Sequence, residues 1–288
     1  MNDYFVSILL GAIEGLTEFL PVSSTAHLRI AEALLQIDLK DGFWKMYSIA
    51  IQLGAILALT AFFWRRIWKF LGTFPRSEAG DRTVFTHPLS LVAIAFLVTA
   101  IPAFLLTKVI GKNLENLHVM AYALLIGGIV MWAVDAFFVR PKIFRMEEMN
   151  LPTAIWIGAV QVFSAVFPGT SRSMCTIAAG QVAGMSREAA LEFSFFLSIP
   201  TMFVATSYDL LKTIRPHAAP ETIAPLTMTP HLWLVLALGF VVAFVVAFGV
   251  VAWFLHWVRR HGFAPFAIYR ILLGLILLFA LGRGLLGP

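Results

Sequence analysis

The sequence predicts an all-α integral membrane protein with six transmembrane helices and two re-entrant helix hairpins arranged in an inverted-topology repeat. Three observations lead to this fold class. Hydrophobic residues make up 60% of the 288 residues and charged residues only 13%, a balance that suits lipid as the solvent. Apolar segments of membrane-spanning length recur along the chain, and its two halves resemble each other in sequence.

The transmembrane helices are predicted from the length of the apolar segments. A helix needs roughly 20 mostly apolar residues to cross the hydrocarbon core of a bilayer. Six segments meet this requirement: 43–64, 89–107, 117–139, 188–210, 230–258 and 266–286.

Two further apolar stretches, 4–36 and 151–184, are too long for one simple crossing, and each is interrupted near its middle by proline and hydroxyl residues. Each half of such a stretch has about 16 residues and would extend roughly 24 Å as a helix, which is short of the ~30 Å hydrocarbon core. We therefore expect both stretches to form hairpins that enter the membrane and return to the same side.

The internal repeat appears when the sequence is shifted by 147 positions, which places Gly11 on Gly158, Pro21 on Pro168 and Ser24 on Ser171. The same shift superimposes the predicted spans. The chain is thus predicted to be a single membrane domain, 1–288, built from repeat one (1–147) and repeat two (148–288). Because each repeat has one hairpin and three crossings, the second copy must enter the membrane from the opposite side.

The orientation follows from the distribution of lysine and arginine between the two sides. One side has Arg65, Arg66, Lys69, Arg76, Arg82, Arg140, Lys142, Arg145, Arg187, Arg259 and Arg260, and the other has Lys40, Lys45, Lys108, Lys112, Lys212, Arg215 and Arg283. The excess places the first side in the cytoplasm, and the first hairpin then enters from the outer face. The basic residues form no continuous stripe and accompany no nucleic-acid motif, so the net charge of +5 does not indicate a nucleic-acid partner.

The first hairpin contains two acidic residues, Glu14 and Glu18, spaced so that a helix places both carboxylates on one face. Acidic groups within an apolar segment are costly and mark a functional cavity by default. A divalent metal bound together with phosphate oxygens would compensate such a pair. The alternative is a structural pair that reaches water at the mouth of the hairpin.

The segment that follows, Pro21 to His27, combines a helix-breaking proline with hydroxyl residues that include Ser24 and Thr25. These hydroxyls supply hydrogen-bond donors at a turn, although capping of the next helix would also account for them. His27 could transfer protons or attack as a nucleophile, but a single histidine is more often structural.

The second hairpin carries the complementary charge. Arg172 lies between Ser171 and Ser173, directly after a Pro-Gly turn and at the presumed start of a helix. Helix N-termini and guanidinium groups both bind phosphate. The alternative for Arg172 is a structural ion pair with Glu192 or Asp135. On the phosphate-binding interpretation, one copy of the repeat holds the acids and the other holds the cation.

These two motifs, Glu14 to His27 and Pro168 to Ser173, resemble those of the bacterial undecaprenyl-pyrophosphate phosphatases, also called bacitracin-resistance proteins. The resemblance extends along the chain, including Glu192–Phe195 and the Tyr269-Arg270 pair. It implies hydrolysis of undecaprenyl diphosphate to undecaprenyl phosphate and phosphate in the bacterial plasma (inner) membrane. That reaction regenerates the lipid carrier for peptidoglycan synthesis.

The resemblance also implies roles for particular residues. The catalytic residues are expected to be Glu14, Glu18, Ser24, His27 and Arg172, with Mg²⁺ or Ca²⁺ bound by Glu14 and Glu18. The phosphates are expected to be held by Arg172, Ser171, Ser173 and Thr25. We expect the site to open to the outer (periplasmic) face. The sequence leaves the nucleophile open among Ser24, His27 and water.

Two alternatives remain at the level of the whole protein. Inverted repeats and broken helices also describe transporters, so the same midplane site could serve a transporter or flippase of a polyprenyl phosphate. The sequence also leaves the oligomeric state open, with a homodimer among the states it allows. Membrane lipids are the expected surroundings in either case.

The sequence departs from the usual family pattern at two positions, where Ala26 and Met174 replace glycine. If the backbone at either position needs a positive φ, the side chain costs roughly 1 kcal/mol or more. A strained backbone at Ala26 or Met174 would change the turnover rate or the fit of the substrate, whereas the reaction class would stay the same.

Overall fold

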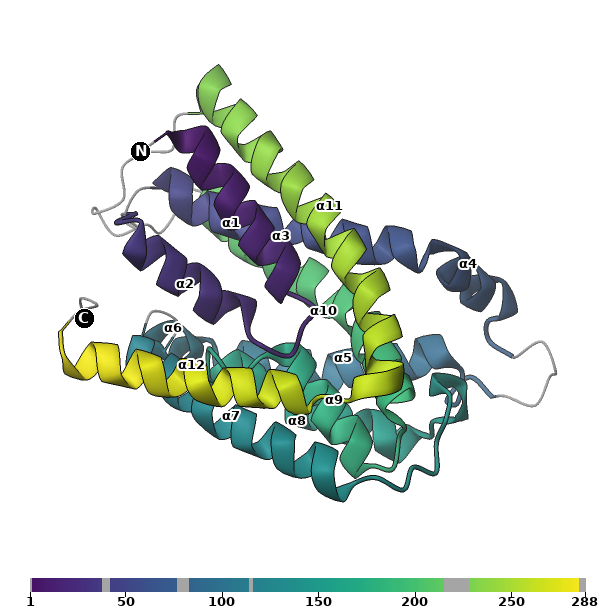
Figure 1. Ribbon diagram of the computed structural model, residues 1–288. Coiled ribbons are helices and arrows are strands. Elements are labelled where there is room, and N and C mark those ends of the chain that lie inside the picture. The colour runs from purple at the N-terminus through teal and green to yellow at the C-terminus, as the bar shows by residue number, and fades with distance from the viewer. Residues whose placement is uncertain (1, 38–41, 77–82, 114–115, 215–227, 285–288) are drawn as a thin grey trace.

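The structure is a computed structural model that describes residues 2–37, 42–76, 83–113, 116–214 and 228–284. The described residues form a bundle of α-helices of very different lengths (Figure 1), and they contain no β-strand beyond one isolated bridge between Ile143 and Met185. The all-α class is therefore confirmed.

Six helices are long and apolar enough to cross a membrane, as predicted. They are α3 (Gly42–Phe62), α5 (Pro88–Leu105), α7 (Leu117–Phe137), α10 (Arg187–Ile214), α11 (Pro230–His261) and α12 (Ala264–Gly282). In lipid, a helix satisfies every backbone polar group within its own segment, which is why apolar length alone locates these elements. Their ends differ from the predicted ones by only a few residues.

The two interrupted stretches each form a pair of shorter helices. The first pair is α1 (Asp3–Thr17) and α2 (Ser24–Leu34), and the second is α8 (Leu151–Val166) and α9 (Arg172–Val182). The longest of these helices, α8, has 16 residues and extends only about 24 Å. We call α1–α2 hairpin one and α8–α9 hairpin two.

The hairpins pack crosswise between the two halves of the chain. Hairpin one lies against α11, where a Cβ added to Gly11 would come within 2.5 Å of the carbonyl oxygen of Gly239. Hairpin two lies against α5, where a Cβ added to Gly158 would come equally close to the carbonyl oxygen of Ala95. Helices that approach this closely need small residues at the contact. Each hairpin is thus held by a long helix of the other half, and α7 packs against α12 between them.

Polar contacts identify the two ends of the bundle. At one end Arg66 pairs with Glu147 at 2.7 Å and also with Glu192; Glu147 lies in η1 (Met146–Glu148), which leads into α8. At the other end Asp3, the first residue of α1, bonds His231 of α11 at 2.9 Å. The two hairpins therefore begin at opposite ends of the bundle.

The sequence analysis did not predict two short helices, α4 (Trp64–Thr73) and α6 (Thr107–Asn113). Each follows a spanning helix after a single intervening residue. Their sequences predict only the end of a span or a loop, because neither segment has the apolar length of a crossing.

Candidate active site

The two hairpins turn in the same way. α2 begins after Ser23 and α9 begins after Ser171, and these N-cap serines have φ values of 74° and 72°. The Oγ of each serine accepts a hydrogen bond at 3.4 Å from the backbone N–H three residues on, that of Ala26 or Met174. Positive φ is unusual for a residue other than glycine and clusters at functional sites.

The two N-cap serines are offset by one residue from the predicted repeat. Ser23 and Ser171 are 148 positions apart, one more than the shift of 147 taken from the sequence. In the structure Ser24 therefore corresponds to Arg172, whereas the sequence alignment paired Ser24 with Ser171 and Thr25 with Arg172. The shift of 147 aligns Pro21 with Pro168, so it does not show that the turns after these two prolines differ in length by one residue.

Ala26 and Met174 occupy equivalent positions in this register, the third residue of α2 and of α9. Neither has a positive φ, so the condition under which a side chain would be strained is not met. Both residues are buried, Ala26 against α7 and α12 and Met174 in the main core. The replacement of glycine therefore carries no backbone penalty at either position.

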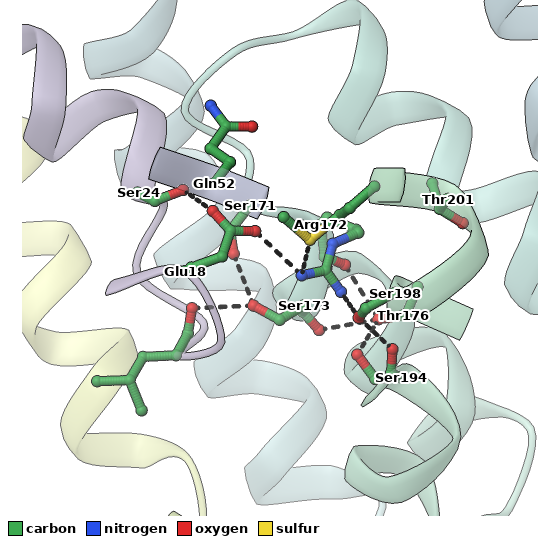
Figure 2. Close-up of polar contacts among 12 residues, drawn as sticks. Glu18, Ser24, Gln52, Ser171, Arg172, Ser173, Thr176, Ser194, Ser198 and Thr201 are labelled. Atoms are coloured by element: carbon green, nitrogen blue, oxygen red, sulfur yellow. Dashed lines mark hydrogen bonds and ion pairs between the residues drawn. The ribbon is translucent and has the colours of Figure 1, made fainter. Parts of the chain in front are cut away.

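Glu18, in the turn of hairpin one, joins the two hairpins. Its Oε1 accepts a hydrogen bond from Nη2 of Arg172 at 3.1 Å, and its Oε2 accepts one from the hydroxyl of Ser24 (Figure 2). The side chains of Glu18 and Arg172 are only 9% and 12% exposed. Charged groups at this depth need partners, and here each is the partner of the other.

Arg172 is held from a second direction by α10. Its Nη1 donates to the hydroxyl of Ser198, and its Nη2 lies 3.2 Å from the sulfur of Met202 (Figure 2). Ser198 in turn donates to the carbonyl oxygen of Ser194 at 2.6 Å. The guanidinium is thus oriented through both terminal nitrogens, Nη1 by Ser198 and Nη2 by Glu18.

The structure excludes the alternative in which Arg172 forms a structural pair with Glu192 or Asp135. Glu192 pairs with Arg66, and Asp135 pairs with Arg187 at 2.7 Å. Both pairs lie at the end of the bundle away from the start of α1. Glu192 is therefore a structural partner and does not support Arg172.

The remaining hydroxyls of hairpin two link the turns. Ser173 donates to the carbonyl oxygen of Leu20 at 2.9 Å, and its oxygen lies 3.0 Å from that of Ser171. Both serines are buried, whereas Thr25, in the first turn of α2, is partly exposed. Amides in the first turn of a helix have no acceptor within the helix, so α2 and α9 both present donors suited to phosphate oxygens.

Glu14 lies one helical turn before Glu18 and is fully buried. Neither of its carboxylate oxygens has a hydrogen-bond partner among the residues that the structure describes. Glu14 has no exposed surface and Glu18 is only 9% exposed, so this geometry does not favour a pair that reaches water at the hairpin mouth. A buried, unpartnered carboxylate requires a proton or a cation.

A divalent cation fits this arrangement in part. The described residues contain no cluster of three or more His, Cys, Asp or Glu side chains that could hold a metal ion. Mg²⁺ is usually bound by one or two carboxylates together with substrate phosphates and water. Glu14 and Glu18 match that mode, with the remaining ligands supplied from outside the protein.

The ring nitrogens of His27 contact Ser23 and Tyr269. Its Nδ1 lies 2.7 Å from the carbonyl oxygen of Ser23, and its Nε2 lies 2.6 Å from the hydroxyl of Tyr269. A carbonyl can only accept, so Nδ1 carries the proton and Nε2 accepts from Tyr269. With both nitrogens engaged, His27 links hairpin one to α12, and no hydrogen bond joins it to Glu18 or Arg172 among the described contacts.

The site also contains residues that sequence reasoning did not select. Ser198 and Met202 contact Arg172, Thr176 bonds Ser194 at 2.6 Å, and Tyr269 contacts His27. Ser194 and Ser198 lie one turn apart within an apolar span, the spacing of a polar helix face, and this spacing is the signal that could have identified them.

Comparisons with known proteins show the family of the chain. The profile of the family described as bacitracin resistance protein BacA matches residues 7–276. A protein of Koribacter versatilis named undecaprenyl-diphosphatase is 62% identical over 286 residues, which are 98% of this chain and all of the relative. Proteins with the same name from Thermus thermophilus, over 95% of both chains, and from Rhizobium etli, over 99% of both, are each 41% identical.

Proposed function

The chain belongs to the bacitracin resistance protein BacA family, and we propose that its reaction takes place where the turns of hairpins one and two meet. The chain is a multi-pass membrane enzyme that hydrolyses undecaprenyl diphosphate to undecaprenyl phosphate and phosphate, which recycles the lipid carrier for cell-wall synthesis. The transporter alternative is not favoured, because the similar relatives are named for hydrolysis.

One observation carries this location of the site: a single carboxylate, that of Glu18, accepts from Ser24 of its own hairpin and from Arg172 of the other. A hydroxyl bonded to a carboxylate is an activated nucleophile beside its base. The guanidinium beside it matches the charge and shape of phosphate. A nucleophile, a base and a phosphate-binding cation are therefore brought together from two distant segments.

Arg172, Ser171 and Ser173, together with the first-turn amides of α2 and α9, bind the diphosphate. Thr25 is positioned in the first turn of α2 to add a further hydroxyl. Helix N-termini contribute partial positive charge to such a cradle. Ser198 and Met202 hold the guanidinium in place while Glu18 is released to act as a base.

In the chemical step the oxygen of Ser24 attacks the terminal phosphorus as Glu18 takes the hydroxyl proton. The bond from that phosphorus to the bridging oxygen breaks, and undecaprenyl phosphate leaves. Glu18 passes the proton it took from Ser24 to the departing bridging oxygen. Water then attacks the phosphoserine as Glu18 takes a proton from it, and Glu18 returns that proton to the Oγ of Ser24 as phosphate is released. His27 does not act as nucleophile in this scheme, because its Nδ1–H and Nε2 are both engaged.

Glu14 and Glu18 would hold Mg²⁺ or Ca²⁺, which supplies charge neutralisation for the phosphate oxygens. The protein charges support this proposal. When both are ionised, Glu14 and Glu18 carry two negative charges, of which Glu18 is paired with Arg172, so a divalent cation would compensate Glu14 and the phosphate oxygens together.

The topology proposed for the chain is an inverted repeat with two re-entrant hairpins in the plasma (inner) membrane, and the site opens to the outer face. The hairpins begin at opposite ends of the bundle and their helices are too short to cross, which supports the repeat, and the lysine and arginine excess supports the orientation. A homodimer stays a prediction; each chain carries both hairpins, so the proposed site needs no second copy.

The test uses purified protein in detergent with undecaprenyl diphosphate labelled in the terminal phosphate. We expect phosphate release by the unsubstituted chain and a loss of about 10³-fold or more for Ser24→Ala and Glu18→Gln, as for removal of a nucleophile or its base. Acid quenching should trap label on Ser24. Label on His27, or single-turnover release with no labelled protein, would contradict the serine mechanism.

Thr60→Ala is a matched control, because this hydroxyl bonds only the carbonyl of its own helix at Ile56 among its described contacts. Its phosphate release should equal that of the unsubstituted chain.

A further inference from the structure

The two hairpin turns share one buried cation, Arg270 of α12. Its side chain has no exposed surface. Nη1 donates to the carbonyl oxygen of Pro21 in turn one, and Nη2 donates to that of Gly169 in turn two, each at 3.1 Å. Nη2 also donates to the carbonyl oxygen of Ala123 in α7 at 3.1 Å. One guanidinium thus connects both turns and a spanning helix.

The two turn carbonyls are equivalent. Pro21 and Gly169 each lie two residues before the N-cap serine of their hairpin, Ser23 and Ser171. Ala123, the third acceptor, is the residue that the shift of 147 places on Arg270 itself. A single arginine, present in one half of the chain, therefore binds matching points of both halves.

Arg270 has no carboxylate partner in the part of the chain that the structure describes, and its Nε has no acceptor there. A buried charge without a counterion is costly and is kept where a function requires it. Gly127 leaves room for the guanidinium of Arg270. A Cβ at position 127 would clash with Nη2 of Arg270 and lie within 2.9 Å of Cε of Met174.

We propose that Arg270 is a positioning residue that sets the distance and angle between the two turns, and thereby between Glu18 with Ser24 on one side and Arg172 on the other. A carboxylate could bind neither carbonyl, and a neutral amide has too few donors for three acceptors, whereas the planar guanidinium matches them in a fixed geometry. Because Arg270 bonds backbone and does not contact the Glu18–Arg172 pair, it acts through the turns.

This inference rests on the proposed function, and its consequence is a loss of rate more than of binding. A misplacement of about 1 Å between reacting groups can cost about 100-fold in rate. Removal of Arg270 leaves all the groups that bind the diphosphate in the protein. We therefore expect kcat to fall by about 100-fold in Arg270→Gln while KM changes little, and Arg270→Lys to recover part of kcat.

The distance between the hairpins provides a readout that is independent of activity. Spin labels are attached at the exposed positions Leu34 and Phe163 after Leu34→Cys and Phe163→Cys in a Cys175→Ser background, and double electron-electron resonance measures their separation in detergent. A narrow distance distribution is expected with Arg270, a broad one with Arg270→Gln, and an intermediate one with Arg270→Lys.

Gly127→Ala tests the same idea with the arginine retained, because the added methyl displaces the guanidinium. It should lower kcat and broaden the distribution in the same direction as Arg270→Gln. Gly249→Ala is its control, since a Cβ there meets no atom within 4 Å, and it should change neither measurement.

Two results would overturn the proposal: a kcat within a few-fold of the unsubstituted value in Arg270→Gln, or a lost kcat with an unchanged narrow distribution. If Arg270→Gln does not fold, Gly127→Ala decides by the same two criteria. If the unsubstituted chain releases no phosphate, the proposed function fails, while the distance measurement still tests whether Arg270 holds the turns together.

Discussion

At the scale of single residues, the site combines groups that are satisfied with one that is not. Glu18 and Arg172 satisfy each other across the hairpins, and His27 is satisfied by Ser23 and Tyr269. Glu14 is fully buried, and both of its oxygens are unpartnered within the described part of the chain. Natural proteins often accept such a cost at functional sites, so Glu14 should contribute to activity at the expense of stability.

Glu14→Gln tests whether Glu14 contributes to activity at the expense of stability. The amide removes a buried charge while keeping the shape of the side chain, so the thermal unfolding temperature in detergent with EDTA should stay equal or rise. The Mg²⁺ concentration needed for half-maximal phosphate release should increase by about tenfold or more, because one of two carboxylate ligands is lost.

Gln161→Glu is a useful comparison, since Gln161 is the residue that the repeat places on Glu14 and is likewise buried. It introduces a charge without a second acid one turn away and should lower the unfolding temperature. A lower unfolding temperature for Glu14→Gln in EDTA, or an unchanged Mg²⁺ requirement, would show that Glu14 is a structural residue.

At the scale of helices, the hairpins depend on close contacts of small residues with the opposite half of the chain. Gly11 faces the backbone of α11 and Gly158 faces that of α5, and Thr99 of α5 donates to the carbonyl oxygen of Gly158 at 2.8 Å. Lipid provides no hydrophobic force between helices, so van der Waals packing at such contacts holds the hairpins in place.

Gly11→Val and Gly158→Val should each destabilise the protein by about 1–3 kcal/mol, the usual cost of overpacking. The measurement is the unfolding midpoint in detergent, followed together with phosphate release. Gly72→Ala is the control, because a Cβ at Gly72 meets no atom within 4 Å and alanine favours a helix. Equal midpoints for all three variants would mean that these contacts do not support the hairpins.

At the scale of the whole molecule, charge pairs and chemistry occupy different regions. Arg66 pairs with Glu147 and Glu192 where α4 and α10 begin, and its guanidinium lies 5.5 Å from the ring centre of Phe70. The proposed site lies at the hairpin turns, which are reached by chain segments that begin at both ends of the bundle. Stability and catalysis should therefore respond to different substitutions.

Arg66→Ala should lower stability by about 1–3 kcal/mol, because it leaves the half-buried Glu192 without its cation. Arg259→Ala should cost at most about 1 kcal/mol, since Arg259 and its partner Glu188 are 64% and 51% exposed and exposed pairs contribute little. Unfolding midpoints check both values. At a temperature where both variants are folded, kcat should equal that of the unsubstituted chain, and a large fall in kcat for Arg66→Ala would contradict the separation.

The sequence by itself determined the six helices that are long and apolar enough to cross a membrane, the two interrupted segments and the residue types of the proposed site, because these depend on local properties. Apolar length specifies a crossing helix in lipid, proline breaks one, and a charge within an apolar segment is rarely accidental. The acid pair, Ser24 and Arg172 were all predicted on such grounds.

Only the tertiary structure decided which of these groups meet. Glu18 and Arg172 are 154 positions apart, and their contact depends on how two turns pack against each other. The same packing brings His27 into contact with Tyr269 and pairs Glu192 with Arg66. It also offsets the two N-cap serines by one residue from the predicted repeat and places Arg270 between the turns. Local periodicity contains no information on these choices, because each depends on the shape of a partner helix from the other half of the chain.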